Sequence, residues 1–414
     1  MMLPMADRTE METCLGDVLV ISNGHGEDLN GGLVCDAFLA LAPGHSVGAL
    51  PIVGGGRAYR RRGLPLLVQG VDLPSGGMVY QGFNLFRDLI AGWIPQTLAQ
   101  IRAARSQGPR YRLVLSIGDH VPLLFAWLTG RPTVVFLVST SSYYEGKLRL
   151  PQLTRWLCSR PEVLHVLTRD AFTARDLQSQ GLAKARFVGY PVMDALQSRE
   201  GQEPLEGLSC DAALNAISIV LLPGSRLPEA QANLALMVQV CERIVQLAPE
   251  QPWSFEAAVV PGTTGPGLVQ EIEAMGWRAN NHHLVKGKAR ISISADAFAE
   301  TLQRARLVLG MAGTAVEQAV GLGKPVVQLV GRGPQFTYAF AEAQMRLLGQ
   351  AVFTVGRQPA GSREIDSSAE LILQMLADPH LPAICQSCGL ERVGPPGGSR
   401  AIAQVLLEHL DANG

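Results

Sequence analysis

The chain has 414 residues, of which 47% are hydrophobic and 17% are charged, and its formal net charge is −1. This length exceeds what one ordinary hydrophobic core accommodates, so it predicts two domains. The nearly balanced charge excludes the broad basic surface that a nucleic-acid-binding protein needs. Seven scattered cysteines are typical of a reducing compartment. Since no apolar run reaches transmembrane length and residues 1–16 lack the apolar core of a signal peptide, we expect a cytoplasmic protein.

The first predicted strand, residues 17–22, follows a polar N-terminal segment, residues 1–16, that we expect to be flexible. It leads into the glycine-rich turn NGHGED, residues 23–28, and α/β folds bind ligands at such turns. A leucine stands where the dinucleotide fingerprint G-x-G-x-x-G has its third glycine, which disfavours a nicotinamide cofactor. His25 and Glu27 are candidates for proton transfer, with the alternative that His25 only fills the turn.

A second predicted strand ends in three consecutive glycines, residues 54–56. Such a run costs chain entropy unless the backbone needs positive φ or close approach, so it is either a tight turn or a ligand loop. The two turns together supply the candidate cleft residues of the first half, namely Gly24, Gly26, Glu27, Gly54 and Gly55.

The segment Met78–Ile101 is crowded with aromatic and aliphatic side chains and carries few charges. A core helix is the ordinary interpretation of such a segment. Its aromatic content also suits a surface that contacts a membrane interface or a greasy acceptor groove.

A strand is predicted at 112–117, and Asp119 and His120 follow its carboxyl end, ahead of a predicted helix at 121–129. Parallel strands present their carboxyl ends at the ligand-bearing edge of a sheet. Asp119 is therefore a candidate catalytic residue at the same edge as His25, with helix capping as the alternative.

The apolar pattern lapses at residues 197–214, which we interpret as a linker between two domains. The N-terminal domain is then 17–196 and the C-terminal domain is 215–390. Residues 391–414 form a turn and a final helix that can pack back on the N-terminal domain.

The C-terminal half begins with a strand at 217–222, followed by the turn Pro223-Gly224-Ser225-Arg226 and a helix opened by Pro228 and Glu229. Gly224 and Ser225 offer backbone amides at this helix start, and Arg226 can pair with a diphosphate through two hydrogen bonds. The alternative is an arginine on an ordinary loop.

A second unit of this kind lies at Arg306–Val330, where an apolar strand, a glycine turn, a helix and another strand follow one another. Gly313 lets the backbone approach a phosphate at the helix start, and the Thr314 hydroxyl can donate to it. Thr314 and Glu317 also match a capping box, which would explain Glu317 without a ligand. Both turns follow strands of one half, which favours a shared phosphate site.

Four motifs make the chain resemble the GT-B glycosyltransferases, and specifically the lipid-A-disaccharide synthase family: LPIVGGG, FVGYPVMDAL, IVLLPGSRLPE and GMAGTAVEQAVGLGKPVV. The resemblance implies an α/β GT-B fold, with two Rossmann-like parallel-sheet domains facing a central cleft. It further implies a UDP-sugar as substrate and no cofactor. Since no Asp-x-Asp lies on these turns, the sequence requires no metal. The implied donor-binding residues are Gly224, Ser225, Arg226, Gly313 and Thr314 for the diphosphate, Glu317 for the ribose and Gln335 near the sugar.

The first half departs from the synthase, because its turn NGHGED is more similar to the His-containing turn of glycosyltransferases that act on lipid acceptors. We therefore expect transfer of GlcNAc or a related sugar to a lipid-linked acceptor. The protein would sit peripherally on the inner face of the membrane, with Asp119 or His25 as the base. The alternatives are a non-hydrolysing UDP-sugar epimerase and a sugar-nucleotide-binding protein without catalysis. The sequence leaves the oligomeric state open.

Overall fold

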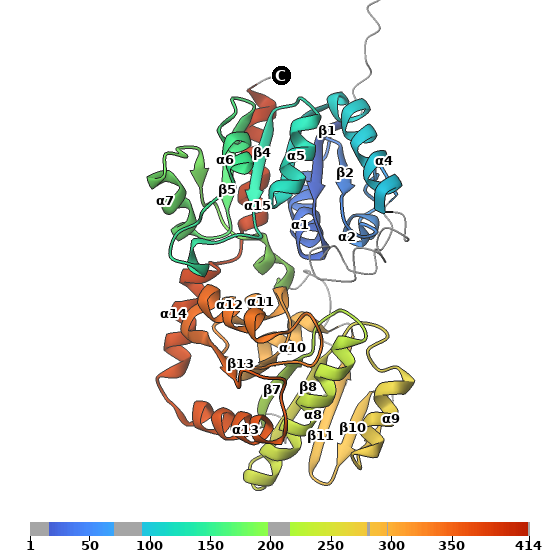
Figure 1. Ribbon diagram of the computed structural model, residues 1–414, viewed down its shortest axis with the longest axis vertical. Coiled ribbons are helices and arrows are strands. Elements are labelled where there is room, and N and C mark those ends of the chain that lie inside the picture. Colours follow the sequence, from blue (N-terminus) through green and yellow to red (C-terminus); the bar gives the residue numbers. More distant parts are fainter. Residues whose placement is uncertain (1–15, 70–92, 198–215, 280–281, 296, 413–414) are drawn as a thin grey trace, which may run out of the picture. The chain divides into compact units, whose positions relative to one another are not determined.

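The structure is a computed structural model that describes residues 16–69, 93–197, 216–279, 282–295 and 297–412. The chain forms two compact units (Figure 1). Unit 1 comprises Met1–Ser142, Leu148–Pro191 and Gly397–Gly414, and unit 2 comprises Tyr143–Lys147 and Val192–Pro396. The boundary after Pro191 precedes the predicted one at 196 by a few residues, and almost all of the predicted linker lies outside the described residues.

Unit 1 is built on a six-stranded sheet in the order β2-β1-β3-β4-β5-β6, in which every pairing is parallel. Its strands are nearly continuous apolar runs because helices cover both faces of the sheet. The strands are β1 (Gly16–Ser22), β2 (Val47–Pro51), β3 (Tyr111–Gly118), β4 (Thr133–Leu137), β5 (Val163–Thr168) and β6 (Ala185–Arg186).

The helices of unit 1 form a layer on each face of this sheet. Right-handed crossovers place α1 on one face and α4, α5, α6 and α7 on the other. The C-terminal helix α15 packs against α1, and Arg112 Nη2 donates to the Leu410 carbonyl at 2.9 Å. These helices are α1 (His25–Leu41), α2 (Arg57–Arg60), α4 (Trp93–Ser106), α5 (His120–Leu128), α6 (Gln152–Ser159), α7 (Ala171–Ser179) and α15 (Gly398–Asp411).

Unit 2 contains an eight-stranded sheet in the order β14-β13-β12-β7-β8-β11-β10-β9. Most pairings are parallel, but β10 runs antiparallel to β11 and β9, and this edge was not predicted. The strands are β7 (Ile217–Leu222), β8 (Trp253–Ala258), β9 (Arg278–Ala279), β10 (His283–Lys286), β11 (Ala289–Ser294), β12 (Leu307–Gly310), β13 (Val326–Leu329) and β14 (Val352–Val355).

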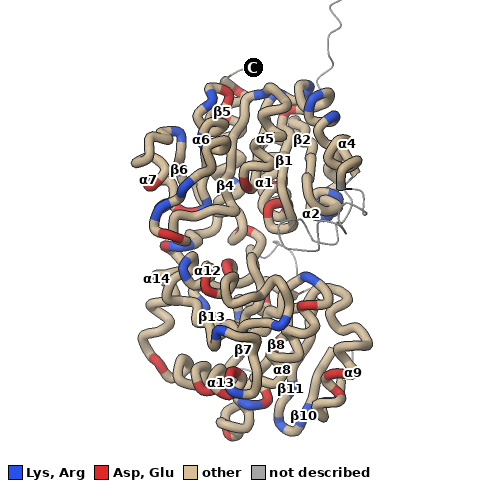
Figure 2. Tube along the Cα trace, viewed as in Figure 1, with Lys and Arg blue, Asp and Glu red and all other residues tan. Residues whose placement is uncertain are grey.

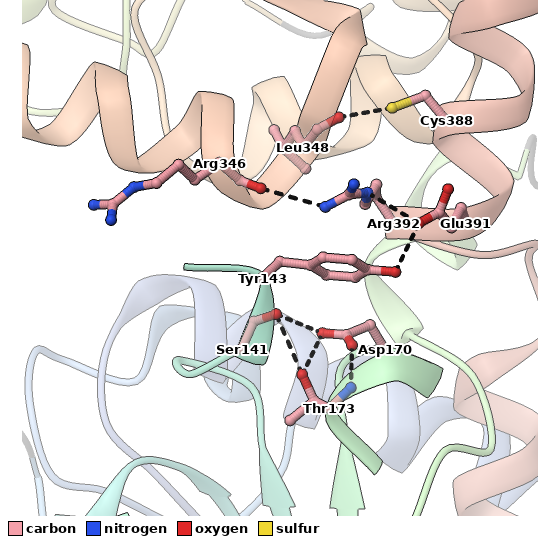
Figure 3. Close-up of polar contacts among 9 residues, drawn as sticks. All are labelled: Ser141, Tyr143, Asp170, Thr173, Arg346, Leu348, Cys388, Glu391 and Arg392. Carbon is pink, nitrogen blue, oxygen red and sulfur yellow. Dashed lines mark hydrogen bonds and ion pairs between the residues drawn. The ribbon is translucent and has the colours of Figure 1, made fainter. Parts of the chain in front are cut away.

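The helices of unit 2 include a C-terminal pair that is tied together by polar contacts (Figure 3). The Cys388 thiol of α14 donates to the Leu348 carbonyl of α12 at 2.9 Å, and Arg392 Nη1 donates to the Arg346 carbonyl of α12 at 3.3 Å. The Arg392 guanidinium also stacks on the ring of Tyr143, outside this pair, at 3.7 Å from its centroid. The helices are α8 (Glu229–Leu247), α9 (Pro266–Ala274), α10 (Phe298–Arg304), α11 (Thr314–Gly321), α12 (Tyr338–Leu348), α13 (Ser362–Ala377) and α14 (Leu381–Arg392).

Two predictions about membranes and surface charge can be compared with this fold. Among the described helices, none has the length and apolarity needed to cross a bilayer. Residues 78–92 of the predicted membrane-facing segment lie outside the described part of the chain, and the remainder opens helix α4. In the described residues, Lys and Arg are interspersed with Asp and Glu along both units (Figure 2).

Candidate functional site

Unit 2 has a topological switch point between strands β7 and β12. From β7 the chain continues through α8 to β8 on one side, whereas from β12 it continues through α11 to β13 on the other. Connections that leave adjacent parallel strands in opposite directions open a crevice at the carboxyl edge of the sheet, where α/β proteins bind ligands. The turns after these two strands are the ones that carry the predicted donor-binding residues.

The two turns are in direct contact. The Met311 amide, just after β12, donates to the Leu222 carbonyl at the end of β7 at 2.8 Å. Gly224 has φ +101°, and a Cβ at this position would come within 3.0 Å of the Met311 carbonyl oxygen. The positive φ at Gly224 and its close approach to Met311 both favour glycine here, because a side chain would disturb them. The structure places Pro223–Arg226 and Gly313–Thr314 at one edge of one sheet.

The helix starts differ in detail from the prediction. Helix α8 begins at Glu229, so Gly224 and Ser225 belong to the loop before the helix rather than to its first turn. Helix α11 begins at Thr314 after Gly313, and no side chain caps it. The predicted capping box is therefore wrong, because Thr314 lies inside the helix and cannot close it from the N-cap position. Glu317 is half-buried on the first turn of α11.

A third loop, residues 331–336, is bound to the start of α8 by the carboxylate of Glu229. The sequence indicates Glu229 only as part of a helix start. Glu229 is 8% exposed, and it accepts hydrogen bonds from the amides of Gln335 at 3.2 Å and Phe336 at 2.7 Å. A Cβ on Gly333 would lie 2.3 Å from the Glu229 carboxyl carbon. This loop therefore packs on the start of α8, which positions Gln335 beside the turn that carries half-buried Arg226.

Unit 1 has an equivalent switch point between β1 and β3, since β1 connects to β2 and β3 connects to β4 on opposite sides. The turns after these strands meet, because Asn23 Nδ2 donates to Asp119 Oδ1 at 3.2 Å. Asp119 Oδ1 also accepts from the Val121 amide at 2.8 Å and so caps α5. The capping alternative is thus realised, and the other carboxylate oxygen lies 4.0 Å from His120 Nδ1.

The other candidate residues of unit 1 lie around this edge. Helix α1 begins at His25, which is exposed, after Gly24 with φ +130°. Glu27 accepts a hydrogen bond from Ser139 Oγ, beyond β4, at 2.7 Å. The glycine run 54–56 is buried, and φ is +80° at Gly54 and +62° at Gly56, a backbone conformation that favours glycine. The edge therefore gathers His25, Glu27 and Asp119 from the turns after β1 and β3.

A buried acid lies beneath this edge. Asp28 is 1% exposed, and its Oδ1 accepts a hydrogen bond of 2.6 Å from Ser22, whose hydroxyl in turn accepts one of 2.7 Å from Tyr59. Burial raises the pKa of Asp28 to about 7, because ionisation in an apolar surrounding is unfavourable. Its position directly after Glu27 gave no sequence signal of burial.

No protein-family model and no curated protein sequence matches the chain. Solved structures do match over nearly the full length, and three of them have a TM-score of 0.57. A putative UDP-N-acetylglucosamine 2-epimerase from Listeria monocytogenes is 14% identical, with 96% of this chain and 97% of that chain covered. The S. aureus MnaA–UDP structure is 12% identical over the same shares, and the calicheamicin glycosyltransferase CalG4 is 16% identical, with 95% and 99% covered.

These similarities agree with what the two sheets show independently. Each unit is a Rossmann-like parallel α/β unit with a topological switch point, and the chain carries two of them in succession. At such low identities the similarity establishes the fold and not the activity. The chain therefore has the GT-B fold.

Proposed function

We propose that the protein is a glycosyltransferase that moves a sugar, GlcNAc or a relative, from a UDP-sugar to a lipid-linked acceptor at a membrane surface. The observation that carries this proposal is that the two glycine turns adjoin at the switch point of unit 2. The Met311 amide donates to the Leu222 carbonyl at the end of β7 at 2.8 Å, and a Cβ on Gly224 would lie 3.0 Å from the Met311 carbonyl oxygen. Helix α11 starts from one of these turns, and a helix start favours an anion. Arg226 on the other turn adds a cation suited to a diphosphate.

The proposed reaction is a displacement at the anomeric carbon of the donor sugar. The acceptor oxygen forms a bond to that carbon, the bond to the diphosphate oxygen breaks, and UDP leaves. Asp119 or His25 takes the acceptor proton. Arg226 and the turns at Gly224, Ser225, Gly313 and Thr314 stabilise the charge that grows on the diphosphate, while Glu317 and Gln335 contact the ribose and the sugar. The proposal needs no cofactor and no metal.

A lipid-linked acceptor is supported by an apolar surface on three neighbouring helices of unit 1. Helix α5 packs against both α4 and α6. Trp127 of α5 and Trp156 of α6 meet edge to face at 6.2 Å, although each is almost half exposed, at 46% and 48%. The large apolar side chains exposed on this face are Ile94, Leu98, Leu124, Trp127, Leu153 and Trp156.

The charges on the same helices fit a negatively charged lipid surface. The sequences of α4, α5 and α6 contain Arg102, Arg105 and Arg155 and no aspartate or glutamate. Tryptophan and arginine together are typical of protein surfaces at the headgroup level of a bilayer. This face supports membrane contact through α4, which contains the end of the predicted segment Met78–Ile101, and through α5 and α6, which lie outside that segment.

Turnover of a UDP-sugar tests the proposal. The purified protein, incubated with radiolabelled UDP-GlcNAc and bacterial lipid extract, should release UDP and label a lipid. Arg226→Ala should reduce donor use severely, whereas Asp119→Ala should keep UDP affinity and lose turnover. Absence of UDP binding by calorimetry would end the proposal, as would full activity of Arg226→Ala.

Epimerisation is the second candidate, because several of the matched structures are named UDP-GlcNAc 2-epimerases. Conversion of UDP-GlcNAc to its 2-epimer in the absence of lipid, followed by proton NMR, would favour this alternative. UDP binding without either reaction would instead indicate a sugar-nucleotide-binding protein that lacks catalysis.

A further inference from the structure

A buried side chain donates hydrogen bonds to the inner side of the glycine turn before α11. Gln344 of α12 is 4% exposed, and its Nε2 donates to the carbonyl oxygens of Ala312 at 3.0 Å and Gly313 at 3.3 Å. Since carbonyl oxygens only accept hydrogen bonds, the nitrogen of this carboxamide must face them. The Ala312 carbonyl therefore points toward the interior of unit 2. The Gly313 carbonyl also accepts from the Val316 amide at 3.0 Å, so both Gln344 and the first turn of α11 set its direction.

The direction of these carbonyls fixes the direction of the next N–H groups. In a trans peptide the carbonyl and the following N–H lie in one plane and point in opposite directions. The only cis peptide among the described residues is Leu227–Pro228, so the peptides after Ala312 and Gly313 are trans. The N–H groups of Gly313 and Thr314 consequently point away from Gln344 and out of the interior, at the edge of the sheet where the two turns meet.

Gln344 is itself oriented by a chain of buried hydrogen bonds. Its Oε1 accepts from Gln328 Nε2 of β13, and Gln328 Oε1 accepts from Thr354 Oγ1 of β14 at 3.1 Å. Gln328 is fully buried. Both carboxamides thus use their oxygen and nitrogen, which fixes each rotamer because a flipped amide would leave a buried group unsatisfied.

The neighbouring turn has the same arrangement. Asn233 of α8 is 2% exposed, and its Nδ2 donates to the Pro223 carbonyl at 3.0 Å. By the same geometry, the Gly224 N–H points away from Asn233 and outward. Within the described part of the chain, the N–H groups of Gly224 and Gly313 donate no hydrogen bond to a protein group.

We propose that Gln344 and Asn233 are positioning residues that aim the N–H groups of Gly224, Gly313 and Thr314 at the diphosphate of a nucleotide. This inference rests on the proposed function, since it assigns how that donor site recognises its anion. Neither side chain touches the ligand. Each acts by holding carbonyls inward, so that the opposite ends of the same peptides stay directed outward before the ligand arrives.

Calorimetry with UDP and with uridine separates this role from a general loss of structure. Gln344→Met and Asn233→Leu keep the side-chain size but remove the donor. Each variant should bind UDP about tenfold to a hundredfold more weakly, since amide contacts to a charged phosphate weaken when the amides lose their direction. Uridine, which lacks the diphosphate, should bind with unchanged affinity.

Gln100→Met is the matched control, because Gln100 is a buried glutamine of unit 1 that also donates to two successive carbonyls, those of Pro51 at 3.1 Å and Ile52 at 2.9 Å. It should leave UDP affinity unchanged. Gln344→Glu serves as a second variant if Gln344→Met does not fold, and circular dichroism establishes folding. Unchanged UDP affinity in a folded variant, or equal weakening of UDP and uridine, would overturn the inference alone. Failure of the wild-type protein to bind UDP would overturn the proposed function with it.

Discussion

Replacing Asp28 by asparagine should stabilise unit 1 relative to the wild type by an amount that grows between the unfolded pKa of 3.8 and the folded pKa of about 7 and is constant at alkaline pH. The carboxyl is 1% exposed, and its Oδ2 has no hydrogen-bond partner among the described residues. Burial raises the pKa of Asp28 from 3.8 to about 7 in the folded state. Above pH 7 the folded protein must ionise this buried group, whereas the unfolded chain ionises it in water.

The sign and size of the effect follow from proton linkage. Near pH 4 the Asp28 carboxyl is largely neutral in the folded state and lowers the free energy of unfolding only slightly. As the pH rises toward 7, the unfolded chain loses its proton first, so the free energy of unfolding falls. A pKa raised from 3.8 to about 7 corresponds to about 4 kcal/mol in total. Between pH 5 and pH 8, the free energy of unfolding of the wild type should fall by about 2–3 kcal/mol of this total.

The measurement is urea unfolding of wild type and Asp28→Asn at pH 5 and pH 8, followed by circular dichroism. The new amide nitrogen in the variant costs a pH-independent amount, about 1–3 kcal/mol, so the difference between the two pH values is the informative quantity. Asp36→Asn is the control, since Asp36 lies on the same helix but is exposed and pairs with Arg62 at 2.7 Å. A difference between wild type and Asp28→Asn that does not change with pH would refute the reasoning.

Two further predictions concern the membrane face and the Gln335 loop. Trp127→Glu with Trp156→Glu should abolish co-flotation with anionic phospholipid vesicles, whereas Leu390→Glu, which replaces an apolar residue of unit 2 that is 58% exposed, should not. Unaltered flotation of the double variant would contradict a membrane role for this face. Glu229→Gln should destabilise unit 2 by about 1.5–3 kcal/mol in urea unfolding, because the hydrogen bonds from the Gln335 and Phe336 amides lose their charged acceptor and the new amide nitrogen replaces the oxygen that faces the Gln335 N–H. An unchanged unfolding midpoint would show that this carboxylate does not hold the loop.

The turns that follow β1, β3, β7 and β12 could be located from sequence alone, because each follows an apolar run and contains glycine, aspartate or serine. Their meeting in pairs also followed from the rule that parallel strands end at one edge. The Asn23–Asp119 and Leu222–Met311 hydrogen bonds, at 3.2 and 2.8 Å, show that the chain segments at these strand ends lie side by side in pairs.

What the sequence could not reveal depends on contacts between residues far apart in the chain. Gln344 follows the turn that it holds by about thirty residues, and nothing in its local pattern distinguishes it from a surface glutamine. The capping box at Thr314 failed for a different reason, because the local match was present but the helix began one residue early, after Gly313. Asp28 follows an acidic neighbour in an exposed-looking turn, and only the packing of Tyr59 and Ser22 around it reveals its burial.

The central claim is that two touching turns of unit 2 hold the diphosphate of a UDP-sugar. A crystal structure with UDP bound tests it most directly. We predict phosphate oxygens about 3 Å from the N–H groups of Gly224, Gly313 and Thr314, with the Arg226 guanidinium against the same diphosphate. UDP bound at the opposite edge of the sheet, or with its phosphates away from both turns, would contradict the claim.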